Sequence, residues 1–187
     1  RLGRQELDAE LIEDNPDALW ARATIDATRV RSAPDLTRIV VAVDPPATSG
    51  PNADECGIVV AGIDASGRAY VLDDRSMGGL TPLTWASRAA KAYRDYNADR
   101  IVAESNQGGE MVSTIMRQVM PTASLKLVRA TRGKWLRAEP VAALYERGQV
   151  SHVGALARLE DQMCDFVPGA AKSPDRLDAL VWALTDL

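Results

Sequence analysis

The sequence contains very little histidine or cysteine. Among its 187 residues there is one histidine, His152, and there are two widely separated cysteines, Cys56 and Cys164. Zinc sites and histidine-based catalytic triads need these residue types in groups, so the sequence argues against both. We expect the cysteines to be buried free thiols in a reducing compartment. His152 lies in an apolar segment, which favours a structural role over a catalytic one.

The sequence also lacks a membrane-spanning segment, a signal peptide and a phosphate-binding loop. Its longest apolar runs, Ile39–Val43 and Gly57–Ile63, are too short to span a membrane. Its first residues are polar and charged, unlike a signal peptide. The phosphate-binding pattern GxxxxGK[ST] is absent, so we do not expect ATP hydrolysis from this chain. Because the sequence begins with Arg1 rather than Met, we expect a fragment or a processed product.

What is present fits a globular domain. The apolar content is 46%, and 187 residues are enough for one domain with a sizeable core. We expect residues 1–38 to be an N-terminal extension and linker that packs on the core, with GRQELDAELIED as a short amphipathic helix and with Leu19 and Trp20 as packing anchors. Residues 39–187 are then expected to form the main domain.

The apolar pattern predicts three strands followed by alternating helices and strands. Three antiparallel strands followed by alternating elements indicate an α/β fold, a mixed sheet of five or slightly more strands with helices on both faces. The predicted strands are 39–44, 57–64, 68–73, 100–105, 124–129 and a short edge strand at 150–153, with a tight turn at 64–67. The predicted helices are 81–97, 109–120, 134–147 with a bend or restart at Pro140, 155–165 and 174–187.

Two acidic residues end predicted strands. Asp44 ends the first predicted strand, and Glu104 lies at the end of the fourth. If the fourth strand returns through a crossover helix, it lies parallel to the first, and the two carboxylates meet at the edge where open sheets bind ligands. They would repel each other unless a cation lay between them. The alternative is that both are ordinary acids in turns.

Two more acids, Asp175 and Asp178, lie three residues apart near the start of the last helix, so they share a face. Helix-dipole complementarity and capping, with Ser173 as N-cap and Pro174 at the first helical position, could explain Asp175 alone. Asp178 is flanked by apolar residues and needs a partner, for which a metal is one candidate. Oxygen ligands suit Mg²⁺ or Mn²⁺, and two such ions can drive in-line displacement at phosphorus. The sequence therefore predicts a metal-dependent nuclease.

The net charge of −4 is unusual for a protein that binds nucleic acid, but the charge is unevenly distributed. We expect Lys134 and Arg137, with Arg132, to contact phosphates without sequence readout. Asn106 and Gln107, next to Glu104, could hydrogen-bond a phosphate or a ligated water. The alternative for the basic residues is an ordinary solvated helix face, and the alternative for Asn106 and Gln107 is an ordinary polar turn. Between residues 117 and 147 there are two acids, Glu139 and Glu146, and seven basic residues, Arg117, Lys126, Arg129, Arg132, Lys134, Arg137 and Arg147.

Five stretches resemble the nuclease domain of the large terminase subunit of tailed bacteriophages and related gene-transfer particles. They are GRQELDAELIED, VAVDPPATSGPNADECGIVVAGID, IVAESNQGGEMV, RGKWLRAEPVAALYERGQV and SPDRLDALVWAL. The resemblance implies a ribonuclease H-like fold with a two-metal site that cuts double-stranded concatemeric DNA during packaging. Its acidic ligands would fall on Asp44, Glu104 and the DRLD segment, with Asp175 favoured as the third ligand and Asp178 as the position that some relatives use.

The same resemblance implies partners and a location. The full-length family protein has an N-terminal ATPase motor. The portal protein and the small terminase subunit would bind through such a longer chain. The isolated domain is expected to be monomeric, away from membranes, in the cytoplasm of the bacterial host. Two other functions stay open: another ribonuclease H-like nuclease, such as a Holliday-junction resolvase, or a non-catalytic module that binds DNA or docks on the portal.

Overall fold

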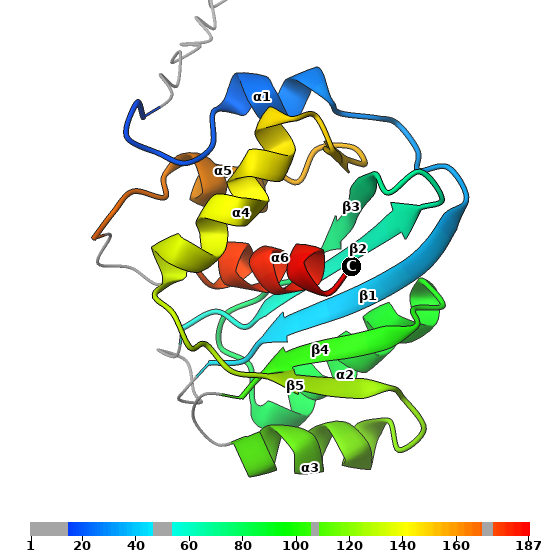
Figure 1. Ribbon diagram of the computed structural model, residues 1–187. Coiled ribbons are helices and arrows are strands. Elements are labelled where there is room, and N and C mark those ends of the chain that lie inside the picture. Colours follow the sequence, from blue (N-terminus) through cyan, green and yellow to red (C-terminus); the bar gives the residue numbers. More distant parts are fainter. Residues whose placement is uncertain (1–14, 47–53, 106–108, 170–173) are drawn as a thin grey trace, which may run out of the picture.

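A computed structural model describes residues 15–46, 54–105, 109–169 and 174–187 (Figure 1). Its centre is one six-stranded sheet with the order β5-β4-β1-β2-β3-β6. Within the described residues, no helix has the length and apolar character needed to cross a bilayer. The strands are β1 (Leu36–Asp44), β2 (Gly57–Asp64), β3 (Ala69–Asp74), β4 (Arg100–Glu104), β5 (Leu125–Val128) and β6 (Val150–His152). The helices are α1 (Arg22–Ala27), α2 (Pro82–Asp95), α3 (Gly109–Val119), α4 (Lys134–Glu146), α5 (Ala157–Cys164) and α6 (Asp175–Asp186).

The strand directions confirm a mixed sheet. β1, β2 and β3 pair antiparallel in sequence order, while β4 pairs parallel to β1, β5 parallel to β4 and β6 parallel to β3. The expected α/β fold class is therefore confirmed, with β6 as the sixth strand at one edge. The turn between β2 and β3 is also as expected, because the side chain of Asp64 accepts hydrogen bonds from the backbone of Ser66 and Arg68.

Helices cover both faces of the sheet (Figure 1). In β1, Val40 and Ala42 belong to the apolar layer under α1, α4, α5 and α6, whereas Val41 and Val43 belong to the layer under α2 and α3. Successive side chains of a strand point to opposite faces, so a strand with both faces covered has an unbroken apolar sequence. This explains why the apolar runs of the central strands could be recognised from the sequence.

α6 lies across β1 and β2 and is buried along most of its length (Figure 1). Ion pairs fix it at both ends. Near its start, Arg176 donates to Glu55 at 2.8 and 2.9 Å and to Asp74 at 2.6 Å. At its end, Asp186 accepts from Arg38 at 2.5 Å and from Lys126 at 2.6 Å.

Most expected elements are present with shifts of one or two residues at their ends. Leu19 packs against the core and Trp20 is buried in it, as predicted. Three details differ from the expectation. β1 begins at Leu36, three residues before its predicted start. α4 continues through Pro140 as a single helix, and Pro174 is the N-cap of α6 rather than its first helical residue. The predicted helix GRQELDAELIED and the predicted cap Ser173 lie outside the described residues. The boundary expected at residue 38 stays a prediction.

The cysteines and the histidine lie in the interior. Cys56 and Cys164 are buried free thiols, as expected. His152 is fully buried between the hydroxyl of Tyr145, at 2.8 Å from its Nε2, and the carboxylate of Glu160, at 2.9 Å from its Nδ1. These contacts join β6 to α4 and α5, which fits the structural role expected for His152.

Candidate functional site

Asp44 and Glu104 lie next to each other at one end of the sheet. β1 and β4 run parallel with Val43 opposite Ala103, and each carboxylate is the following residue on its strand. The crossover expected from the sequence therefore brings the two acids to the same sheet edge. This is the edge at which parallel strands present their carboxyl ends to a ligand.

α6 brings the other two acids to the same place. Asp175 and Asp178 are in its first turn, and both are buried, with 7% and 3% of their surface exposed. Gly57 pairs with Asp44 across the β1–β2 ladder and permits this approach. A Cβ atom at Gly57 would lie 2.0 Å from the carbonyl oxygen of Asp175. The start of α6 therefore rests directly on the backbone of β2, beside Asp44.

The charges of the four acids act on one another. Burial raises the pKa of Asp44 well above its ordinary value, and the negative charges of Asp178, Glu104 and Asp175 raise it further. Burial also raises the pKa of Asp178, although the neighbouring ammonium of Lys134 opposes this shift. Carboxylates that share a partly dry cleft repel one another, and a bound cation relieves that repulsion.

Two basic residues of α4 contact these acids. Lys134 forms an ion pair with Asp178, and Arg137 lies 3.4 Å from Asp178 and 3.5 Å from Glu104. The side chain of Lys134 is 43% exposed, whereas that of Arg137 is only 11% exposed. The sequence predicts both as phosphate contacts, and that role stays a prediction. Their acidic partners were not evident from the sequence.

Trp182 is a further member of the site that could not be recognised from the sequence. Its indole Nε1–H donates to Oε2 of Glu104 at 2.5 Å, and the guanidinium of Arg137 lies over its ring, 4.7 Å from the centroid. Trp182 is four residues beyond Asp178, so both lie on the same face of α6. In the sequence it looks like an ordinary core residue of an apolar helix.

The acids converge without forming a finished ligand cage. Within the described part of the chain, no three acidic, cysteine or histidine side chains stand in an arrangement that would hold a metal ion. Arg132 is exposed in the loop before α4. Asn106 and Gln107 lie outside the described residues, so their predicted contacts stay predictions.

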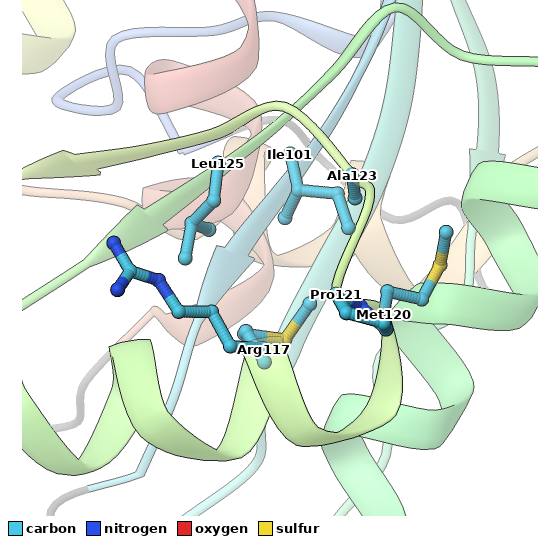
Figure 2. Close-up of a pocket in the computed structure, with 7 residues that line it drawn as sticks. Ile101, Arg117, Met120, Pro121, Ala123 and Leu125 are labelled. Carbon is cyan, nitrogen blue, oxygen red and sulfur yellow. The ribbon is translucent and has the colours of Figure 1, made fainter.

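A pocket of about 400 Å³ lies elsewhere, between α3 and the starts of β4 and β5 (Figure 2). Ile101 and Leu125 line it at the opposite end of their strands from Glu104, and Met116 and Arg117 of α3 close its other side. Its lining contains none of the four acids. We therefore assign the candidate chemistry to the place where Asp44, Glu104, Asp175 and Asp178 meet, called the carboxylate cleft below, and not to this pocket.

Comparison with known proteins gives one family and one fold. The family model described as the terminase RNaseH-like domain matches residues 41–187. No curated protein matches the chain.

Solved structures match over nearly the whole chain at low sequence identity. The nuclease domain of the large terminase subunit gp2 of bacterial virus Sf6 is 12% identical, with 89% of this chain and 98% of that chain covered and a TM-score of 0.67. The P22 large terminase nuclease domain is 13% identical, with 82% and 83% covered and a TM-score of 0.64. The large terminase nuclease from thermophilic phage G20c with bound cobalt is 12% identical, with 91% and 98% covered and a TM-score of 0.61.

Proposed function

Because the chain belongs to the terminase RNaseH-like domain family, we propose that its carboxylate cleft hydrolyses phosphodiester bonds of double-stranded DNA as a divalent-metal-dependent endonuclease. The observation that carries this proposal is that β1, β4 and α6 bring four carboxylates together at one end of the sheet. Burial raises the pKa of Asp44, and the negative charges of Asp178, Glu104 and Asp175 raise it further. A bound cation would relieve this repulsion.

The donor set fits a hard divalent cation such as Mg²⁺ or Mn²⁺, because it consists of carboxylate oxygens without histidine or cysteine ligands. Asp44, Glu104, Asp175 and Asp178 would hold the metal. Two bound ions in such a site supply an activated water and stabilise the leaving oxygen. The cobalt bound by the large terminase nuclease of phage G20c supports a divalent ion in a domain of this fold.

Basic residues near the acids are the ones that we propose to contact DNA. Lys134 is half-exposed at the rim and can exchange Asp178 for a phosphate oxygen, and Arg132 is exposed nearby. Such contacts bind the DNA backbone without reading sequence. In the full-length protein we place this activity in the DNA-packaging machinery of a tailed phage or gene-transfer particle, inside the bacterial host. The portal protein and the small terminase subunit are the partners we propose for that longer chain.

The experiment that tests the proposal is a plasmid cleavage assay with Mg²⁺, Mn²⁺ and EDTA in parallel, on the wild type and on Asp44→Asn. We expect metal-dependent cleavage by the wild type and none by the variant. The melting temperature of the variant without metal should be unchanged or higher, because one of several mutually repelling charges is gone. Asp161→Asn is the matched control. Asp161 is an exposed acid of α5 that pairs with Arg22 of α1, and this variant should cleave normally.

Each other outcome has a definite meaning. Normal cleavage by folded Asp44→Asn would remove Asp44 from the site. Absence of cleavage by the wild type with either metal would favour a non-catalytic binding module. A strong preference for four-way DNA junctions over linear duplex would favour a resolvase.

A further inference from the structure

We propose that Trp182 is a positioning residue of the carboxylate cleft, one that orients Glu104 through its indole N–H and holds Arg137 between Glu104 and Asp178. The inference rests on the proposed function, because it takes Glu104 as a metal ligand. It adds a residue that acts through Glu104 and not on the DNA or the metal directly.

Trp182 lies on the buried face of α6, one turn beyond Asp178, and is 9% exposed. A helix face that carries two metal-ligand candidates therefore also carries the indole. Any movement of α6 that shifts Asp178 moves the hydrogen-bond donor of Glu104 with it, which couples the strand ligand to the helix ligands.

One oxygen of Glu104 faces both the indole N–H of Trp182 and the guanidinium of Arg137. The indole Nε1–H donates to Oε2 of Glu104 at 2.5 Å, and Nη1 of Arg137 lies 3.5 Å from the same atom. A hydrogen bond from a buried donor to one oxygen restricts the orientations that the carboxylate can adopt. Partners of this kind set ligand orientation in metal sites, and their removal lowers metal affinity by roughly 10–100-fold.

Arg137 depends on Trp182 for its position. Its guanidinium is mostly buried, and its Nε and Nη1 have no hydrogen-bond partner among the described residues. What fixes it is the stack on Trp182 at 4.7 Å together with the two carboxylates at 3.4 and 3.5 Å. An aromatic face attracts a guanidinium most strongly where water is excluded. Trp182 therefore sets the place of the positive charge that lies between Glu104 and Asp178.

The test is the variant Trp182→Phe, which removes the indole N–H and keeps an aromatic face for Arg137. We expect Mn²⁺ affinity, measured by calorimetric titration without DNA, to fall by roughly 10–100-fold. The Mn²⁺-induced rise in melting temperature should fall with it, since a ligand stabilises the folded state only as its concentration exceeds the dissociation constant.

The chain offers a matched control in Trp20, which is 2% exposed in the same apolar layer and whose Nε1 has no hydrogen-bond partner among the described residues. Trp20→Phe removes the same atoms without removing a hydrogen bond. It should lower stability and leave Mn²⁺ affinity at the wild-type value. If both variants lose affinity equally, the effect is general loosening and the proposal is overturned.

Glu104→Gln separates failure of this inference from failure of the proposed function. Loss of Mn²⁺ binding in Glu104→Gln with wild-type binding in Trp182→Phe would overturn the positioning role alone. Wild-type binding in Glu104→Gln would show that Glu104 is not a ligand and would remove it from the proposed metal site.

If Trp182→Phe does not fold, the wild type still gives an answer. In a Mg²⁺ titration of ¹⁵N-labelled protein, the indole N–H resonance of Trp182 should shift and that of Trp20 should not. A Trp182 resonance that stays unmoved at saturating metal would overturn the proposal.

Discussion

A single methyl group at Gly57 should disable the carboxylate cleft while the domain remains folded. The added Cβ would lie 2.0 Å from the carbonyl oxygen of Asp175 and 3.0 Å from Cβ of Ala179. Ordinary contact begins at 3.4 Å, so the start of α6 has to withdraw from β2 by about 1.4 Å. The obstacle is backbone, which cannot rotate aside as a side chain can.

The two expected effects of Gly57→Ala differ in size. Overpacking of this kind destabilises a domain by roughly 1–3 kcal/mol, which for a chain of this length lowers the melting temperature by about 2–4 °C for each kcal/mol. Displacing a reacting group by about 1 Å can lower a rate by roughly 100-fold. Cleavage and the Mn²⁺-induced stabilisation should therefore fall much further than stability does.

Gly62→Ala is the matched control. Gly62 is also in β2, and an added Cβ would lie 2.7 Å from Cδ1 of Leu36 and 2.9 Å from the carbonyl oxygen of Arg38. This crowding is at the start of β1, away from the end that carries Asp44. The control should lose stability but keep plasmid cleavage and the Mn²⁺-induced shift. Cleavage by Gly57→Ala at a near wild-type rate would refute the idea that Gly57 sets the distance between the start of α6 and β2.

Two further predictions concern charged residues. Lys134→Ala should weaken DNA binding and reduce the slope of log affinity against log salt concentration by about 0.9 for each phosphate that is no longer neutralised. Mn²⁺ should stabilise the variant more than the wild type, because Asp178 no longer has a competing cation. An unchanged affinity and slope would place the DNA elsewhere. Burial opposes ionisation of Glu160, but hydrogen bonds from His152 and Arg29 lower its pKa well below the ordinary 4.5. The contribution of ionised Glu160 to the stability of the folded protein is therefore complete above pH 4.5 and is lost as the pH falls below 4.5. In urea unfolding, Glu160→Gln should be less stable than the wild type at pH 7 and show a smaller loss towards pH 3, and parallel pH profiles would contradict this.

The parts of the fold that the sequence predicts are those with a local signal. β2 can be recognised over its full length because both of its faces are covered, which leaves an unbroken apolar run. Asp44 and Glu104 can be paired from the sequence, because parallel strands joined by a crossover end at the same edge. Both inferences need only strand order and strand ends.

The contacts that organise the site have no local signal. Trp182 meets a carboxylate 78 positions away, and Asp175 near the C-terminus lies against Gly57 in the second strand. A tryptophan in an apolar helix and a glycine at a strand start have common structural explanations, so neither points to the cleft. The sequence assigns Arg137 to a basic surface because its sequence neighbours are basic, although its side chain is mostly buried.

The charged residues of α6 are best explained by the position that the helix must keep. Arg176 and Asp186 are buried charges near its two ends, and each is paired across to the strands or the segments that flank them. Buried ion pairs add little net stability compared with well-packed apolar residues, but losing one partner is costly, so they penalise a helix that slides or turns. That is what the carboxylate cleft requires. Asp175 and Asp178 are ligand candidates only in one register, in which the first turn of α6 contacts Gly57 and Trp182 reaches Glu104. A core held by apolar contacts alone would tolerate a shift along the helix axis that this site would not.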